Sequence, residues 1–183
     1  YEKMLEYAYK SLDSIQQFKK NHPSIVNKYR QIAYAYFAQK QYENAEKYAQ
    51  KALSYAQTPS HKRDIYFSLE DIYFIQKDYK KALKILRHAV QVSYNLDEDY
   101  SLYKVPTIDT TEYVLELNLV KLIGRIVQVF FQYYLSETKE EKDLLTAWEY
   151  MQLFVRLFED LQKQYSSEQD YLLTLNRLSF YYG

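Results

Sequence analysis

The residues that could do chemistry in this chain are few and scattered. Its histidines are His22, His61 and His88. No two of them have the i, i+4 spacing with which one helix face presents two imidazoles to a metal ion. We expect all three to be solvated surface residues, and we predict no metal site.

Acidic pairs are present, but in the wrong surroundings for catalysis. Glu140-Glu141 and Asp97-Glu98-Asp99 lie in strongly charged stretches that read as loops. A general acid needs a buried site that shifts its pKa, and neither stretch offers one. No serine is flanked by the glycines of a nucleophile elbow, and no phosphate-binding loop is present. We therefore expect no catalytic residue and no cofactor, and the chain is predicted not to be an enzyme.

Composition limits the fold further. The chain has 183 residues, of which 48% are hydrophobic, 23 are Tyr, and only 2 are Gly and 3 are Pro. So little Gly and Pro favours a nearly all-helical chain, and tyrosines suit thin layers whose core lies near water. The 24 basic and 24 acidic residues balance, so no nucleic-acid partner is expected.

The sequence gives little evidence about the compartment. Cysteine is absent, which excludes a disulfide framework and a thiolate nucleophile. No apolar run reaches the length of a membrane span, and no signal peptide is visible. We favour the cytoplasm.

One stretch organises the chain, because it recurs. Residues 29–53 read YRQIAYAYFAQKQYENAEKYAQKAL, and residues 66–90 read YFSLEDIYFIQKDYKKALKILRHAV. Residues 1–12 repeat the second half once more, so one helix-pair unit is present about two and a half times. Because the chain starts inside a unit, we interpret it as part of a longer protein. The matched pairs are Tyr29/Tyr66, Ile32/Leu69, Tyr36/Tyr73, Gln39/Gln76, Lys40/Lys77, Tyr42/Tyr79, Ala45/Ala82 and Ala52/Ala89.

Small residues explain how each pair closes. Two antiparallel helices approach closely only where side chains are small, and Ala33, Ala45 and Ala52 provide such positions. Tyr42 and Tyr79 are 37 residues apart (79 − 42), against roughly 34 for a plain unit of this kind. The excess lies between units, where Thr58-Pro59 predicts a helix start.

These residues resemble the tetratricopeptide repeat family. The pattern is aromatic, aliphatic, small, aromatic in the first helix, then Tyr, small, aliphatic, small in the second, and it covers residues 24–93 well and 1–18 partly. The resemblance implies an all-α, right-handed superhelical array of antiparallel helix pairs, with about eight helices. It also implies a protein-interaction scaffold. Glu70, which stands where Ala33 stands, departs from the pattern and either loosens the packing or points into a groove.

Three segments follow from the pattern. Residues 1–93 hold the repeats, residues 94–109 are a connector, and residues 110–183 form a longer helix pair and a final helix on the same array. Asp109 and Glu112 predict a capped helix that runs to about Leu135, apolar nearly all round and the most buried of all, with Gly124 allowing close approach.

The next helix, residues 143–164, carries an apolar stripe. Its members are Leu144, Trp148, Met151, Phe154, Phe158 and Leu161. We expect this stripe to face the core and Trp148 to be largely buried. Ser166 or Ser167 then caps a last helix, with Tyr171, Leu175, Leu178 and Tyr182 on one face.

The C-terminal part has a second, looser resemblance. Ala147-Trp148, Leu157–Leu161 and Ser166-Ser167-Glu168 are similar to repeat regions that precede CHAT-type caspase-like peptidase domains. No peptidase residues can be carried over. The resemblance implies an alternative function: a regulatory or sensor module of a multidomain enzyme, such as a CHAT-like peptidase, a kinase or a transcription regulator, with its output domain outside this chain.

The first helices of such an array line a concave face. We predict that this face binds a protein or peptide through Arg30, Tyr34, Phe37, Phe67, Asp71, Phe74 and Ile75. Exposed Phe67, Phe74 and Ile75 suggest an apolar peptide or helix, which could be another part of the same polypeptide or a second copy. An interpretation of equal weight is that the 110–135 helix or the neighbouring repeat covers these three side chains. Tyr34 and Asp71 stand where carboxylate-clamp repeats have Asn, which disfavours that ligand class.

Overall fold

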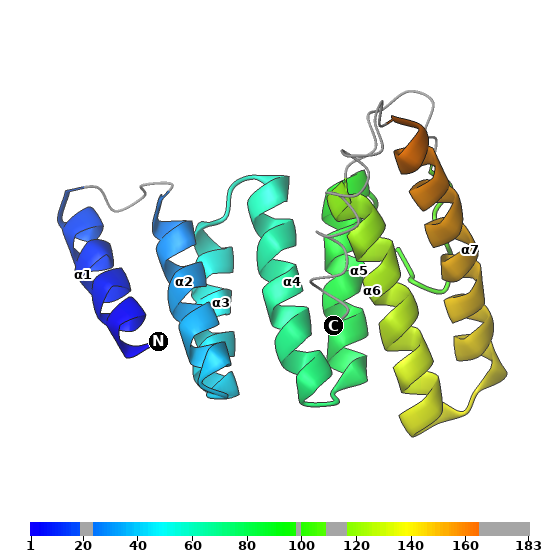
Figure 1. Ribbon diagram of the computed structural model, residues 1–183, viewed down its shortest axis with the longest axis horizontal. Coiled ribbons are helices and arrows are strands. Elements are labelled where there is room, and N and C mark those ends of the chain that lie inside the picture. Colours follow the sequence, from blue (N-terminus) through cyan, green and yellow to red (C-terminus); the bar gives the residue numbers. More distant parts are fainter. Residues whose placement is uncertain (19–23, 98–99, 109–116, 165–183) are drawn as a thin grey trace. The chain divides into compact units, whose positions relative to one another are not determined.

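The computed structural model is helical, as the sequence predicts (Figure 1). It describes residues 1–18, 24–97, 100–108 and 117–164, and no strand occurs in these ranges. The chain divides into two compact units, Tyr1–Asp99 and Tyr100–Gly183. Seven α-helices lie in the described ranges, and the further helix expected after Ser167 falls outside them.

The first unit consists of helices that pack on their neighbours along the chain. A lone helix precedes two helix pairs, α2 with α3 and α4 with α5, and α1 packs on α2 while α4 packs on both α3 and α2. The bounds are α1 (Glu2–Phe18), α2 (Ser24–Ala38), α3 (Tyr42–Tyr55), α4 (Pro59–Ile75) and α5 (Tyr79–Tyr94).

Both pairs close through the same tight corner. Lys40 and Lys77 have φ values of 59° and 61°, in the left-handed region. Gln41 N donates a hydrogen bond to Tyr36 O (2.9 Å), and Lys40 N donates one to Phe37 O (2.8 Å). This pair of hydrogen bonds is typical of a helix end at which the chain reverses. The Gln-Lys match in the sequence therefore marks one repeated turn geometry.

Small residues let the two helices of each pair approach, as predicted. Ala45 and Ala52 in α3 and Ala82 and Ala89 in α5 are all completely buried. Thr58 caps α4, since its side chain accepts from His61 N, and Pro59 occupies the first turn. Glu70 occupies the inward position in α4 that Ala33 occupies in α2, with exposed fractions of 2% and 3%.

Helix α1 is held on the first pair by a cluster of tyrosine hydroxyls. Tyr9 OH lies 3.1 Å from Tyr36 OH and donates to Tyr48 OH at 2.6 Å. Ala8 and Leu12 are buried beside these contacts. Burial and these two hydrogen bonds raise the pKa of Tyr9 far above its usual value.

The second unit is a longer helical hairpin. It contains α6 (Leu117–Tyr133), a π-helical turn, η1 (Tyr134–Thr138), and α7 (Glu141–Gln164). The sequence predicted a helix from residue 110 to about Leu135 with a cap at Asp109 and Glu112, and residues 109–116 lie outside the described ranges. Helix α6 is rich in buried apolar residues: Val120, Leu122, Ile123, Ile126, Val127, Val129 and Phe130.

The expected orientation of α7 is wrong for the first half of its stripe, whereas Leu161 at the end of the stripe is buried as expected. Trp148 is 61% exposed, and Leu144 and Met151 of the same stripe are also exposed. The buried side of α7 carries Leu161 together with six residues outside the stripe: Asp143, Thr146, Ala147, Tyr150, Leu153 and Leu157.

Internal hydrogen bonds explain why α7 can bury polar groups on this side. Tyr150 OH lies 2.9 Å from Tyr100 OH, and Asp143 accepts from Tyr103 OH at 2.6 Å and from Thr138 Oγ1 at 2.5 Å. Thr146 Oγ1 donates to Lys142 O at 2.8 Å. Because each polar group has a partner, its burial carries little penalty.

Candidate interaction surface

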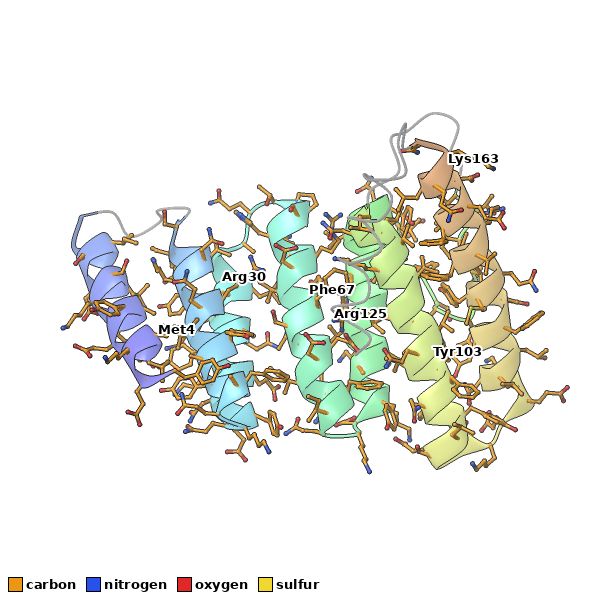
Figure 2. All side chains as sticks on the ribbon, in the orientation of Figure 1. Met4, Arg30, Phe67, Tyr103, Arg125 and Lys163 are labelled. Atoms are coloured by element: carbon orange, nitrogen blue, oxygen red, sulfur yellow. The ribbon has the colours of Figure 1, made fainter. Side chains whose placement is uncertain are left out.

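The first helices of the two repeats, α2 and α4, lie in direct contact. Arg30 Nη1 on α2 forms an ion pair with Asp64 Oδ2 on α4 at 3.1 Å, and each side chain is one-third exposed. Arg30 and Phe67 therefore stand on neighbouring helices (Figure 2). The predicted site residues of both repeats are thus brought onto two adjoining helices.

Two of the predicted residues are open to solvent. Tyr34 on α2 is 57% exposed and Ile75 at the end of α4 is 51% exposed. The Tyr34 ring meets Tyr1 edge-on, with centroids 6.3 Å apart. Of the predicted set, Tyr34 and Ile75 therefore offer a partner the largest exposed fractions of an apolar or aromatic side chain.

Phe37 and Phe74 also have a structural role. Phe37 packs edge-on against Tyr42 with centroids 5.8 Å apart, and Phe74 packs against Tyr79 in the same way at 5.7 Å. Both contacts join the end of a first helix to the start of its partner. Each Phe remains half-buried, so only part of its ring is available to a ligand.

Phe67 and Asp71 occupy intermediate positions on α4. Both are half-buried, and neither is without an interaction inside the protein. Arg30 is half-buried as well, through its ion pair with Asp64. The polar members of the predicted set are therefore partly engaged with the scaffold.

His88 is not a solvated residue, contrary to expectation. Its ring stacks on Tyr66 with centroids 5.9 Å apart, and Nδ1 lies 3.2 Å from Gln91 Oε1. Burial lowers the pKa of His88 below its usual 6.5. His22 lies outside the described residues, and His61 sits half-buried in the first turn of α4.

Within the described ranges, no three His, Cys, Asp or Glu side chains are grouped so that they could hold a metal ion. No helix in the same ranges has the length and apolar character needed to span a membrane.

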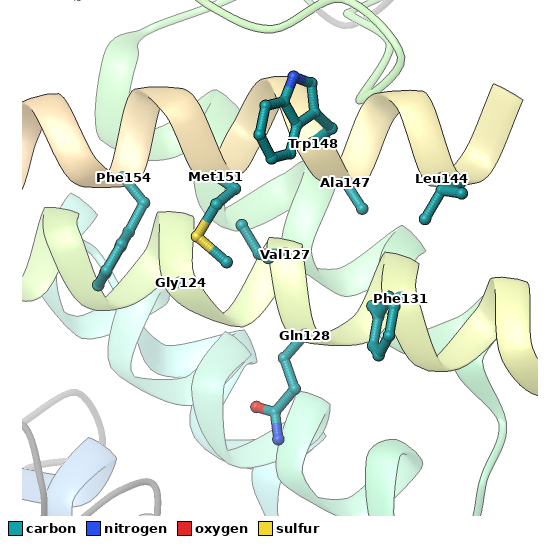
Figure 3. Close-up of a pocket in the computed structure, with 9 residues that line it drawn as sticks. All are labelled: Gly124, Val127, Gln128, Phe131, Leu144, Ala147, Trp148, Met151 and Phe154. Carbon is teal, nitrogen blue, oxygen red and sulfur yellow. The ribbon is translucent and has the colours of Figure 1, made fainter.

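Sequence reasoning missed a surface on the second unit, which we call the α6–α7 groove. It is a cavity of about 650 Å³ between the two helices of the hairpin (Figure 3). Gly124 has no side chain to fill it, and Met151 reaches across toward α6. The lining residues are Gly124, Val127, Gln128, Phe131, Leu144, Ala147, Trp148, Met151 and Phe154.

The signal for this groove was present in the sequence. The spacing of Leu144, Trp148 and Met151 identified one apolar face of α7, but the direction in which that face points was misread. Spacing alone does not say whether an apolar stripe meets the core or an open groove.

Part of the chain matches a known family. Residues 24–95 match the family model described as tetratricopeptide repeat. These residues are helices α2 to α5, the two pairs with the repeated corner. No curated protein matches the chain.

Proposed function

Residues 24–95 are tetratricopeptide repeats, a family that generally mediates protein–protein interaction, and from this premise we propose that the chain is a non-catalytic scaffold that binds a peptide or helix. The proposed binding face is formed by α2 and α4. Its residues are Arg30, Tyr34, Phe37, Phe67, Asp71, Phe74 and Ile75.

The contact between α2 and α4 supports this face most directly. The Arg30–Asp64 ion pair ties the two first helices together, so that a ligand can touch both repeats at once. The binding of such a ligand depends on the position of one repeat relative to the other, and the ion pair helps to fix that position.

The chemistry of the face favours an amphipathic segment over a small molecule. Tyr34 and Ile75 offer exposed apolar area, and partly exposed rings of Phe37, Phe67 and Phe74 extend it. Aromatic anchors of this kind dominate the binding energy of peptide grooves. Arg30 and Asp71 supply one cation and one anion, which would orient the segment.

Peptide selection tests the proposal. A displayed library of short random peptides is selected against the chain, and the recovered peptides are then measured on Tyr34→Asp plus Ile75→Asp. Charges at these two exposed positions should weaken binding at least about tenfold, as expected for loss of hot-spot contacts. The matched control is Glu43→Ala plus Gln50→Ala, two exposed positions on α3.

Three results would contradict the proposal. The library yields no binding peptide, the recovered peptides bind the double variant as well as the parent, or the α3 control loses binding equally. Circular dichroism on each variant ensures that only folded proteins are compared.

A further inference from the structure

We propose that one surface of the α6–α7 hairpin binds a second copy of this chain, so that the two hairpins pair antiparallel about a two-fold axis at the level of Trp148. We call this surface the hairpin face. It belongs to the second unit and shares no residue with the proposed peptide-binding face on α2 and α4. Its seven apolar side chains are Phe131, Leu135, Leu144, Leu145, Trp148, Met151 and Val155.

The hairpin face gathers most of the large apolar side chains that the described residues expose to water. It holds seven of these twelve, with exposed fractions from 37% for Leu144 to 61% for Trp148. If each such side chain offers roughly 150–250 Å², the seven expose roughly 600 Å² together. A standard protein interface buries about 800 Å² on each partner. The face is therefore large enough to form most of a dimer interface, whereas a small molecule would leave much of it in water.

The apolar side chains of α7 form one strip beside the groove. From Met151 to Leu145, the exposed positions span about 120° around the helix. Phe131 of α6 lines the groove together with Trp148 and Met151, which joins the strip to α6. In Figure 3, Trp148 points away from α6 while Met151 points toward it. A protruding indole beside an apolar groove of about 650 Å³ suits a two-fold pair, in which Trp148 of each copy covers the groove of the other.

Two charged residues lie at the ends of this strip. Glu141 precedes it and Arg156 follows it; both are exposed, and neither forms an ion pair with a described residue. They are 15 residues apart (156 − 141), about 22 Å along α7 and about 60° around it, so both point to the same side of the helix. Their midpoint falls between residues 148 and 149, and the midpoint of the strip from Leu144 to Val155 falls between residues 149 and 150. The charges and the apolar side chains therefore share one centre to within a residue.

A two-fold axis through this centre selects the antiparallel orientation. In an antiparallel pair, Glu141 of each copy lies at the level of Arg156 of the other, which gives an ion pair at both ends of the interface. A parallel pair would bring Glu141 to Glu141 and Arg156 to Arg156, and the repulsion between like charges disfavours it. The antiparallel pair also places Trp148 at the middle of the interface, where large aromatic side chains contribute most to binding.

Sedimentation equilibrium of the full chain tests the dimer. The unmodified chain should show twice its mass of 22.2 kDa. Leu145→Asp plus Val155→Asp places charges at two exposed positions outside the groove lining, and should raise the dissociation constant of the dimer at least about tenfold. Circular dichroism checks that each variant is folded.

The matched control places the same charges on the first unit. Tyr34→Asp plus Ile75→Asp changes two exposed apolar residues there, and should leave the dimer intact. The same variant is expected to lose peptide binding. Dimer formation and peptide binding are therefore measured independently of each other.

Charge reversal tests the antiparallel arrangement. Glu141→Arg alone, or Arg156→Glu alone, brings like charges together at both ends of the interface and should weaken the dimer about fivefold. Glu141→Arg plus Arg156→Glu restores opposite charges and should restore the dissociation constant of the parent. In a parallel pair, each single reversal would replace one pair of like charges by another and leave the dissociation constant unchanged.

Four outcomes would overturn the proposal. The chain remains monomeric at millimolar concentration, or the dimer survives Leu145→Asp plus Val155→Asp, which would assign the interface to another surface. A dimer that is insensitive to the single charge reversals, or that the double reversal does not restore, would contradict the antiparallel pairing. Finally, a monomer in which Trp148 resists quenching by acrylamide would mean that another part of the same chain covers the hairpin face.

Discussion

The hydroxyl of Tyr73 on α4 donates a 2.5 Å hydrogen bond to Glu46 Oε1 on α3. This bond links one repeat to the next. Tyr73 is 5% exposed, and Lys81 Nζ on α5 lies 5.4 Å from its ring centroid. The phenol therefore contacts Glu46 of one repeat and Lys81 of the other. Burial, and then the adjacent Glu46 carboxylate, raise the pKa of Tyr73 well above its usual value.

Removing this hydroxyl should weaken the junction between the repeats. Tyr73→Phe should lower the free energy of unfolding by about 1–2 kcal/mol, because a hydrogen bond to a charged acceptor is lost while Glu46 regains water. Chemical denaturation measures the change. Tyr34→Phe, which removes an exposed hydroxyl, is the control, and an equal loss in both variants would contradict this role for Tyr73.

The protein should lose stability in alkali. Burial is the largest cause of a raised pKa at Tyr9, Tyr66, Tyr73, Tyr100 and Tyr103, whose ordinary value is 10.0. Above that pH the unfolded chain releases these protons while the folded chain retains them. The free energy of unfolding should therefore be unaffected by these groups below about pH 10 and fall above it.

Denaturation at a series of pH values measures this loss. In Tyr73→Phe plus Tyr103→Phe the fall above pH 10 should be shallower, because two of the raised groups are gone. An unchanged slope would mean that other groups cause the alkaline loss.

Added volume at the helix-pair contacts should be harmful. Ala45 and Ala82 have no exposed surface, so Ala45→Leu or Ala82→Leu should overpack the pair and destabilise it by roughly 1–3 kcal/mol. Thermal melting measures the effect. Gln50→Leu places the same side chain on the exposed side of α3, and its melting temperature should stay close to that of the parent.

The buried carboxylate at the start of α7 should matter to the second unit. Asp143 is 1% exposed and accepts hydrogen bonds from Tyr103 and Thr138. Asp143→Ala removes both acceptors and should cost about 1.5–3 kcal/mol. Glu149→Ala, which removes an exposed carboxylate from the same helix, should cost much less. Denaturation followed by Trp148 fluorescence reports on this unit.

The repeats could be predicted from sequence because several signals agreed. The Gln-Lys turn, the matched alanines and the aromatic spacing all specified the same helix pairs, and the structure places α2 to α5 where they indicated. Local propensity, turn geometry and packing were consistent there, which is the condition under which sequence patterns are reliable.

The second unit was harder to predict because its buried polar groups resemble surface residues. Asp143, Thr146 and Tyr150 are buried only because hydrogen-bond partners from η1, the 100–108 segment and α7 itself satisfy them. A sequence does not show those partners. Trp148 consequently seemed the better core residue, although it lines an open groove.

For the candidate face, the sequence predicted which helices carry its residues. The repeat alignment placed its residues correctly on α2 and α4, since that follows from helix periodicity alone. It could not show that Phe37 and Phe74 also pack against Tyr42 and Tyr79, because those contacts depend on the geometry of the corner.

The order of contacts in the first unit has a kinetic consequence. Apart from the α2–α4 contact, its helices are in contact mainly with the helices next to them in sequence. Few distant segments must therefore meet before stabilising contacts form, and such chains fold quickly. Each helix can also detach without disrupting those beyond its neighbours. Amide protons of α2 and α3 should accordingly exchange more slowly than those of α1, because α1 can open without breaking the contacts between the helices that follow it.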